Sequence, residues 1–473
     1  MAITINQYAS TPNMANADLV WEVSSNQSTQ PQYQYICVLK DGCNNTLTTV
    51  KQQPNPSGYG VFDLGRLVKQ YLSYDAEKDL FEGGVDGYFQ ASRNTAKFFK
   101  VVFGEEYGTS PSSSVNVYNG ITNATTGSPS YSGSTANYYF INGVLDPNYG
   151  SFNWNTSSFF IPRLTPSSQS FDYNVCLTDA PRTQYARSTD YLTVSALNGN
   201  FNANTTSSQD IYAMQVTLYT ASGVYFDTEY TNVANSAYNP GPRTSDTQLF
   251  SSVSTINVCT SSLGQNRQTS GSLLIHMTIG PQNITNLLDH DLSTIPWTHY
   301  TVRLTNQKQT GSAPFGNPSG SWDEFTIYKT DGACDYNGVR FAFINNYGVW
   351  DWYTFTLADA KQYGFDRGVY KQNFVNYSTN TTSVTYNRTR RGNGTFYTNI
   401  SEDFTANSDW LTQEEADWLE QLFYSPNVYI QDGLNMLPVV ITSGGLTTKT
   451  NPRTQKNYQL TITYQLANSK RAR

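Results

Sequence analysis

The side chains best suited to metal binding gather around Asp289-His290-Asp291, with His299 shortly after them. Zinc sites draw their ligands from patterns such as H-E-x-x-H, and the side chains of adjacent residues rarely point at one ion. Cys37 and Cys43 flank a predicted turn, but their spacing is unlike that of a zinc ribbon. We therefore interpret both groups as ordinary turns and expect neither a metal site nor a cofactor.

Three pairs of adjacent acidic residues could supply the carboxyl groups of a glycoside hydrolase: Glu105-Glu106, Asp323-Glu324 and Glu414-Glu415. Glycoside hydrolysis needs two carboxyl groups roughly 5–10 Å apart on opposite sides of a sugar, whereas neighbours on a strand or helix point in different directions. No G-x-S-x-G, P-loop or dinucleotide motif occurs, and three His leave few options for a His-based triad. The sequence predicts no catalytic residues.

The composition combines many aromatic residues with few charges. The chain has 473 residues, including 35 Tyr and 24 Phe, and only 14% of it is charged. Average globular proteins carry about 25% charged residues, so solubility here must depend on Asn, Gln, Ser and Thr. Such a surface favours hydrogen bonds and aromatic contacts with neighbouring proteins. A net charge of -7 argues against a general electrostatic footprint for nucleic acid, so we expect protein partners and a homo-oligomer.

Two groups of residues are candidates for the interfaces of such an oligomer. A carboxylate between two tryptophans needs a partner to stay charged, and an arginine on the facing strand is available for it. A second group of arginines lies beside Gly392-Asn393-Gly394, which we predict to be a hairpin tip; they could bind an acidic partner or DNA phosphate, or only keep a turn soluble. The candidates are Arg340, Trp350, Asp351, Trp352, Arg388, Arg390 and Arg391.

Alternation of apolar and polar residues with period two runs through the chain and predicts half-buried antiparallel strands. It is clearest over 458–466 and also marks 33–39, which leads into an Asp41-Gly42 turn. Residues 339–355 are expected to form an aromatic hairpin that turns at 345–348. The predicted fold class is mainly β, with tandem antiparallel β-sandwich-like domains and a few short helices.

Two of these helices have recognisable start signals. Asp63 can cap a helix whose apolar residues, from Leu64 to Leu72, follow helical spacing. Thr412 and Glu415 form a capping box, in which each side chain satisfies a backbone N–H that the helix leaves without a partner. Pro426 ends this second helix.

The length exceeds the roughly 250–300 residues at which single hydrophobic cores stop growing, so several domains are expected. Stretches rich in Ser, Thr, Gly, Asn and Pro suggest where they divide. We predict an N-terminal β domain with one helix at 1–108, a loop or arm at 109–165, a middle β domain at 166–306, a linker at 307–321, and a C-terminal β domain with one capped helix at 322–473.

The chain shows no sign of export or of membrane insertion. Its first residues lack the basic and apolar regions of a signal peptide, and no stretch approaches the roughly 20 apolar residues of a membrane helix. Its five Cys are odd in number and scattered, which fits reduced, buried thiols. We expect a protein made in a cytoplasm, with no membrane partner.

Four passages resemble virion structural proteins of tailed bacteriophages, particularly those of Bacteroidetes-type hosts. The passages are 54–64, 176–181, 339–352 and 410–426. They consist of turns and helices that build a fold, so the resemblance brings no catalytic residues with it. It implies a β-rich protein of the tail, baseplate or neck that repeats around a symmetric ring, docks other virion proteins, and is found in the virion after assembly in the host cytoplasm.

The resulting hypothesis is a non-enzymatic virion protein that acts through self-association. Two alternatives stay open: a receptor- or carbohydrate-binding tail protein, and a tail-associated glycan hydrolase. Sugar binding predicts a shallow aromatic surface, and hydrolysis requires two carboxyl groups opposed across a cleft.

Overall fold

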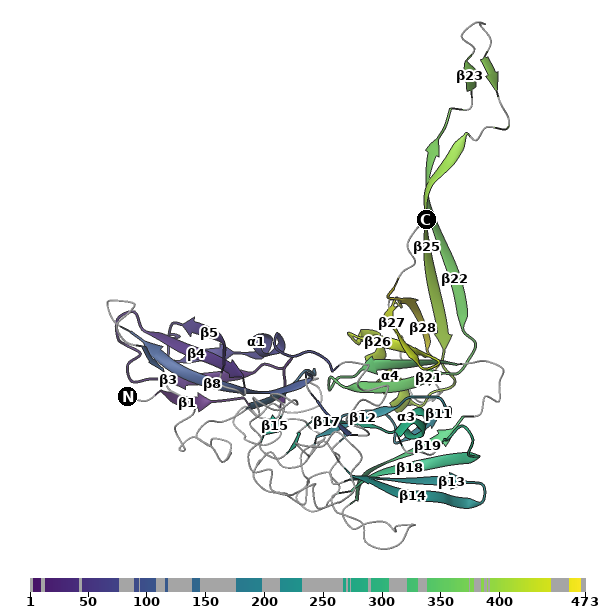
Figure 1. Cartoon of the computed structure of the whole chain (residues 1–473). Helices are drawn as coiled ribbons and strands as arrows, with labels where there is room; N and C mark the ends of the chain where they lie inside the picture. Colours follow the sequence, from purple (N-terminus) through teal and green to yellow (C-terminus); the bar gives the residue numbers. More distant parts are fainter. Residues whose placement is uncertain are drawn as a thin grey trace. The chain divides into compact units, whose positions relative to one another are not determined.

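The computed structural model shows a mainly β protein whose strands are mostly antiparallel (Figure 1). The chain divides into two compact units: unit 1 comprises 1–333 and 343–352, and unit 2 comprises 334–342 and 353–473. The structure describes residues 3–9, 13–41, 45–75, 89–92, 94–107, 115–117, 138–144, 176–197, 213–231, 267–268, 271–272, 274–287, 291–305, 321–330, 338–373, 375–377, 384–386, 389, 392–443 and 459–468.

The N-terminal part of unit 1 is a β-sandwich. One sheet has the order β1-β3-β6, and the other has the order β2-β10-β8-β4-β5 with β9 paired to β8. The strands are β1 (Thr4–Gln7), β2 (Asn13–Met14), β3 (Val20–Ser24), β4 (Gln34–Asp41), β5 (Thr46–Gln52), β6 (Gly60–Asp63), β8 (Ala96–Glu106), β9 (Val115–Val117) and β10 (Tyr138–Ile141).

Aromatic side chains from both sheets fill the space between them. Trp21 of β3 meets Tyr138 of β10 edge to face, with ring centroids 5.2 Å apart, and Phe62 of β6 lies 5.6 Å from Phe103 of β8. Edge-to-face contacts of this kind add to the burial of large apolar areas. The expected sandwich character is therefore confirmed here, and its core is one cluster shared by the two sheets.

Helix α1 (Gly65–Lys69) follows β6 and buries Val68 in the same core. The carboxylate of Asp63 accepts hydrogen bonds from the backbone N–H groups of Gly65 and Leu19, at 3.0 and 3.1 Å. Asp63 thus holds the start of the helix and ties it to the chain before β3, but the N-cap residue is Leu64, which makes no side-chain cap hydrogen bond. The helix also ends at Lys69, so it is shorter than the predicted stretch from Leu64 to Leu72.

The rest of unit 1 is built around a five-stranded sheet with the order β11-β19-β18-β13-β14 and a three-stranded sheet with the order β12-β17-β7. One face of the larger sheet is apolar and buried, for example at Val216, Tyr300 and Ile327. The elements are β7 (Phe89–Ala91), β11 (Thr183–Ala186), β12 (Thr193–Leu197), β13 (Ala213–Thr220), β14 (Gly223–Thr231), β15 (Arg267–Gln268), β16 (Gly271–Ser272), β17 (Leu274–Thr278), α3 (Pro281–Leu287), β18 (Trp297–Thr305) and β19 (Ser321–Lys329).

Most strands of unit 2 belong to a seven-stranded sheet with the order β21-β20-β26-β27-β28-β25-β22, and β23 and β24 form a separate two-stranded sheet. The elements are β20 (Val339–Ile344), β21 (Trp350–Phe355), β22 (Ala360–Lys371), β23 (Val375–Tyr377), β24 (Val384–Tyr386), β25 (Asn393–Asn407), α4 (Gln413–Tyr424), β26 (Val428–Asp432), β27 (Asn435–Ile441) and β28 (Thr461–Leu466). The tip of the β20–β21 hairpin, 343–352, belongs to unit 1, and its base belongs to unit 2.

The predicted aromatic hairpin is confirmed, and its turn has a clear physical basis. Asn345 accepts hydrogen bonds through its side chain from the N–H groups of Tyr347 and Val349, which folds the chain back on itself. Gly348 has a φ of 78°, a conformation that side chains with a Cβ rarely adopt.

Two further predictions for the C-terminal region are confirmed. In β28, Ile462 and Tyr464 are buried while Thr461 is exposed, as the alternation requires. At α4, the hydroxyl of Thr412 accepts from the N–H of Glu415 at 3.2 Å, and the carboxylate of Glu415 accepts from the N–H of Thr412 at 2.8 Å.

Other expectations need correction. Residues 115–117 and 138–141 are strands, although the sequence suggested a loop over 109–165. Asn393 and Gly394 open β25 and pair with Lys371 and Tyr370, so they do not form a hairpin tip. The expected linker at 307–321 lies outside the described residues except for Ser321, which begins β19. The five-part domain division stays a prediction beside the two units.

We expect Thr412→Ala to lower the free energy of unfolding by about 1 kcal/mol, because the first turn of α4 loses a side-chain acceptor. Urea unfolding followed by tyrosine and tryptophan fluorescence measures the change. Thr395→Ala, at an exposed strand position, is the matched control. Equal losses in the two variants would show that the capping box adds no stability.

Candidate functional site

Unit 2 contains a long exposed ribbon made of β22 and residues 393–405 of β25. It is called the arm below and is distinct from the loop or arm predicted at 109–165. The two strands pair from Ala360 opposite Thr405 to Lys371 opposite Asn393, with a bulge at Gly368–Val369. β28 pairs with β25 only at Phe404–Asn407, and β22 is the last strand of the sheet. Figure 1 shows the ribbon extending away from the rest of the seven-stranded sheet.

One face of the arm is apolar and open to solvent. Alternate residues of β22 place Tyr363, Phe365 and Val369 on this face, with exposed fractions of 48%, 57% and 61%. Ile400 lies directly opposite Phe365 and is exposed as well. A two-stranded ribbon has no second layer, so its apolar side chains stay in water unless another molecule covers them.

Cationic side chains alternate with the rings of this apolar face. The Nζ of Lys361 lies 4.8 Å from the ring centroid of Tyr363, and the guanidinium of Arg367 lies 5.5 Å from that of Phe365. Lys361 also bridges to Glu402 at 2.9 Å. Hydrogen bonds to Tyr363 and then to Glu402 raise the pKa of Lys361 above its usual value, so this amine stays charged.

The opposite face of the arm consists of small and polar residues apart from Tyr370 and Tyr397, each of which is 43% exposed. Two glycines make room for tyrosine rings on the ribbon: a Cβ on Gly368 would clash with the ring of Tyr397, and one on Gly394 would clash with that of Tyr370. The remaining paired positions on this face are Gln362, Gly364, Asp366, Asn399, Ser401 and Asp403. The arm is therefore amphipathic, and ring-over-glycine contacts stiffen it.

A second exposed surface lies on the five-stranded sheet of unit 1. Tyr185, Tyr328, His299 and Tyr219 are direct cross-strand partners, one on each of β11, β19, β18 and β13. Neighbouring rings are 5.9, 5.2 and 4.5 Å apart, and the last two pairs are stacked. The row ends at Tyr185, which is 59% exposed and lies on an edge strand.

A row of threonines runs beside this aromatic row. Thr183, Thr326, Thr301 and Thr217 are cross-strand partners two residues along the same four strands, so they share a face with the rings. Thr217 donates to Asp227 of β14 at 3.1 Å, which closes the row at the other edge. This face therefore combines ring edges with hydroxyl groups.

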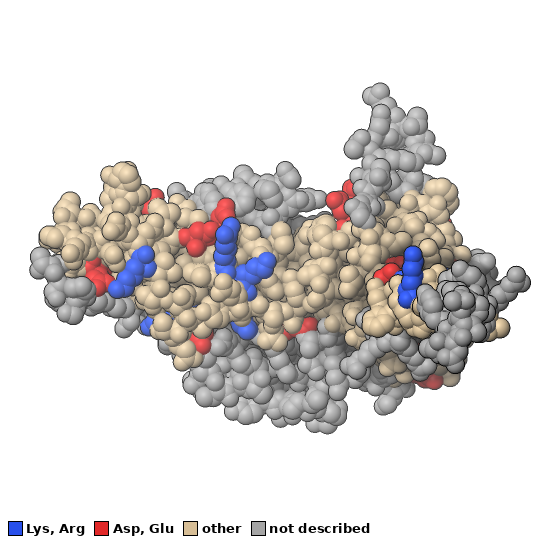
Figure 2. Space-filling model, turned by 90° about the horizontal axis from the view of Figure 1, so that it is seen from above, with Lys and Arg blue, Asp and Glu red and all other residues tan. Residues whose placement is uncertain are grey.

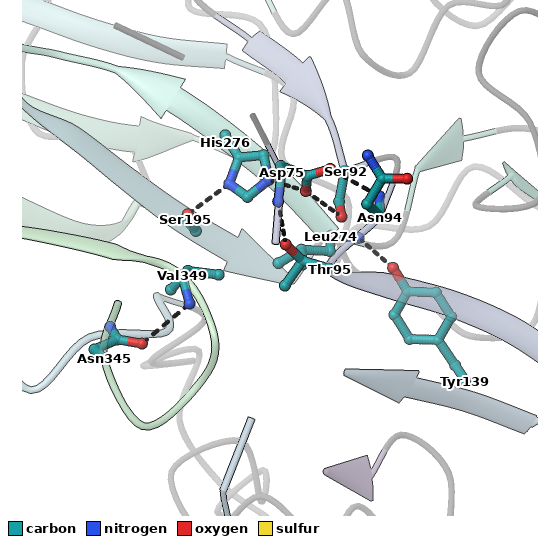
Figure 3. A network of polar contacts seen from close by, with 10 residues as sticks. All are labelled: Asp75, Ser92, Asn94, Thr95, Tyr139, Ser195, Leu274, His276, Asn345 and Val349. Carbon is teal, nitrogen blue, oxygen red and sulfur yellow. Dashed lines mark hydrogen bonds and ion pairs between the residues drawn. The ribbon is translucent and has the colours of Figure 1, made fainter. Parts of the chain in front are cut away.

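A third candidate is a Ser–His–Asp chain inside unit 1 (Figure 3). The Nδ1 of His276 lies 2.7 Å from the hydroxyl of Ser195, and its Nε2 lies 2.8 Å from a carboxylate oxygen of Asp75. β12 and β17 bring Ser195 and His276 together as direct cross-strand partners. Such a chain can activate a serine nucleophile when the hydroxyl reaches substrate.

Asp75 makes three more contacts, two of them through its carboxylate. It accepts hydrogen bonds from the hydroxyl of Ser92 and the N–H of Asn94, each at 2.7 Å, while the N–H of Asp75 donates to the hydroxyl of Thr95 at 3.0 Å. Nearby, the hydroxyl of Tyr139 accepts from the N–H of Leu274, and burial raises the pKa of this phenol. The network ties the segment before β8 to β12 and β17.

Two features of this network favour a structural role. Ser195 and His276 are only 1% and 2% exposed, so the hydroxyl does not face solvent. The imidazole is also turned relative to serine proteases, in which Nε2 faces the serine and Nδ1 faces the aspartate. The buried carboxylate of Asp75, together with its hydrogen-bond partners, holds together three segments that are far apart in the sequence.

The sequence-predicted interface residues fall into two groups. Arg340 is buried and donates to the hydroxyl of Thr354 at 2.8 Å, and Trp350 is buried as well. Asp351 accepts from the hydroxyl of Thr178 at 2.7 Å, and the indole N–H of Trp352 donates to the hydroxyl of Thr193 at 2.9 Å.

The side chains of the first group thus make internal contacts, and their interface role stays a prediction. The three arginines of the second group lie outside the described residues: Arg388, Arg390 and Arg391.

Four of the six residues in the carboxylate pairs make internal contacts, and one of them is Glu415 in the capping box. Glu105 accepts from Ser25 and Tyr33, Glu106 bridges to Lys51, and Glu324 pairs with Arg303. Among the described residues, no three His, Cys, Asp or Glu side chains form a group that could hold a metal ion. Figure 2 shows small, scattered groups of charge on a face dominated by other residues.

Comparison with known proteins finds no matching family model and no match among curated proteins. Within the described part of the chain, the helices are all too short or too polar to cross a membrane. The candidate sites therefore rest on geometry alone.

We expect His276→Ala to lower the free energy of unfolding by about 2–4 kcal/mol, because the buried carboxylate of Asp75 loses a partner. His299→Ala, which removes a partly exposed stacked ring, should cost less than about 1 kcal/mol. Denaturant unfolding of both variants beside the wild type gives the comparison.

A structural role for the Ser–His–Asp chain requires Ser195 to be unreactive in the folded protein. A fluorophosphonate probe, which labels activated serines, should leave Ser195 unmodified, as judged by peptide mass spectrometry against Ser195→Ala. Labelling of Ser195 in the native chain would contradict the structural role and support an enzyme.

Proposed function

We propose that this chain is a non-enzymatic structural subunit of a phage virion, belonging to the tail, baseplate or neck, that self-associates into symmetric rings and docks other virion proteins. The arm is the observation that carries the assembly part of this proposal. A rigid ribbon with an exposed aromatic face is suited to contact a neighbouring protein and has no evident use in an isolated chain. The virion assignment itself rests on the resemblance of the four passages.

Energetics support a binding role for the arm. Full burial of a large apolar side chain is worth about 1.5–3 kcal/mol, and the four exposed side chains of the apolar face are roughly half-covered already. Covering the rest would contribute on the order of 1 kcal/mol per side chain. Several weak contacts of this size, repeated around a ring, are enough to hold subunits together.

The purified full-length chain should form oligomers larger than a monomer at micromolar concentration. Size-exclusion chromatography with light scattering gives the mass, and negative-stain microscopy shows whether the particles are rings. A chain that stays monomeric up to about 100 μM, alone and with other virion proteins present, would contradict the proposal.

A second candidate function is carbohydrate or receptor binding, and the aromatic row beside the threonine row favours it. Tyr and His edges with adjacent hydroxyls can hydrogen-bond a sugar, and Tyr185 at the sheet edge can offer a ring face for stacking. Since the other rings stack on one another, hydrogen bonds would contribute more than ring stacking.

If this sheet face binds glycans, Tyr185→Ala and Tyr328→Ala should each weaken binding to a purified host-surface polysaccharide by about tenfold, since each removes a contact of about 1.4 kcal/mol. Biolayer interferometry with immobilised polysaccharide measures this. Tyr225→Ala, an exposed tyrosine outside the row, is the control and should bind like the wild type. No binding by the wild type would exclude this candidate.

A further inference from the structure

We propose that the apolar face of the arm binds the acidic remainder of a second copy of this chain. This inference rests on the proposed function, because it assigns a surface and a partner to the self-association proposed above. It starts from Tyr363, Phe365, Val369 and Ile400, which share a face that the described part of the chain leaves in solvent.

The distribution of charge selects the partner. The two strands of the arm, 360–371 and 393–405, contain three Lys or Arg and three Asp or Glu, and these charges are divided unevenly between its faces. The apolar face carries Lys361, Arg367 and Lys371 against Glu402, whereas the opposite face carries Asp366 and Asp403. Taking the arm's three basic and three acidic residues from the chain's 29 basic and 36 acidic residues leaves 26 against 33 outside it. The apolar face of the arm is therefore positive and the sequence outside the arm is negative, so each copy carries both halves of a complementary pair.

Arg367 is a cation of the apolar face that is available for such a pair. Arg367 stacks over Phe365, and the described residues supply it with no carboxylate partner. Lys361, in contrast, is already bridged to Glu402. A guanidinium beside an exposed ring can bind a carboxylate of a neighbouring copy while the ring is covered, which joins the apolar and the charged contact in one place.

The geometry of the arm suits a repeated contact between copies. The ring-over-glycine contacts of Gly368 and Gly394 stiffen the ribbon, so little conformational freedom is lost when it docks. An arm of one copy that binds the remainder of the next is a head-to-tail contact, and such contacts close into rings when the rotation permits.

The test compares single substitutions on the two faces of the arm in the full-length chain. Phe365→Glu and Arg367→Glu should each weaken self-association by about tenfold or more, measured by sedimentation velocity over a concentration series. Gln362→Glu adds a negative charge to the opposite face of the same strand and should associate like the wild type. Circular dichroism confirms that all three variants are folded.

Salt dependence and crosslinking identify what the arm touches. Raising the salt concentration from about 50 mM to about 500 mM should weaken wild-type association, because exposed charges are screened. The dissociation constants of the wild type and Arg367→Glu should therefore differ less at the higher salt concentration. A photoreactive phenylalanine analogue placed at 365 should crosslink to a differently tagged copy, at acidic segments outside 360–404.

The outcomes separate this inference from the proposed function. If the wild type self-associates but Phe365→Glu and Arg367→Glu do so equally well, the arm inference is overturned and the assembly function stands. Crosslinks that stay within one chain, or binding only to lipid vesicles, also overturn the inference. A wild type that never self-associates overturns both.

Discussion

Alternate residues of a β-strand point to opposite faces, so every apolar face in this chain needs something to cover it. In the N-terminal sandwich the two sheets cover each other, with Trp21 and Tyr138 meeting in the shared core. In the seven-stranded sheet, helix α4 provides such a cover, with Trp418 meeting Tyr353 edge to face at a ring-centroid distance of 5.9 Å. The apolar face of the arm is different because its aromatic side chains remain in solvent. This difference separates the elements that build the fold from the element for which we propose a role in assembly.

The sequence was a good guide where the signal was local. The capping box of α4, the turn at Asn345 and the alternation of β28 each depend on residues a few positions apart. The strand at 138–141 was missed because Tyr-Tyr-Phe-Ile is buried on both faces and shows no alternation. Gly394 was misread as part of a turn because its role, making room for the ring of Tyr370, depends on a partner strand. The arm itself has a readable alternation, but only the structure shows that its apolar face is exposed.

The buried Ser–His–Asp chain could not have been found from spacing. Its members come from positions 75, 195 and 276, and the sheet register of β12 and β17 is what places two of them side by side. It also shows that residue types and distances do not decide function alone. The same three groups serve catalysis when the hydroxyl meets substrate, and they hold segments together when the hydroxyl is enclosed. Here burial and ring orientation both favour the second role.

The scarcity of charge gives the few charged groups of the arm more influence. Most polar groups of this surface are uncharged. The electrostatic potential of a local excess of cations is therefore less compensated by neighbouring charges than it would be in an average protein. Such an excess guides the approach of an acidic surface over about one Debye length, roughly 10 Å, while the aromatic side chains act only at contact. Charge would therefore set the orientation in which copies meet, and burial of the apolar face would set how long they stay together.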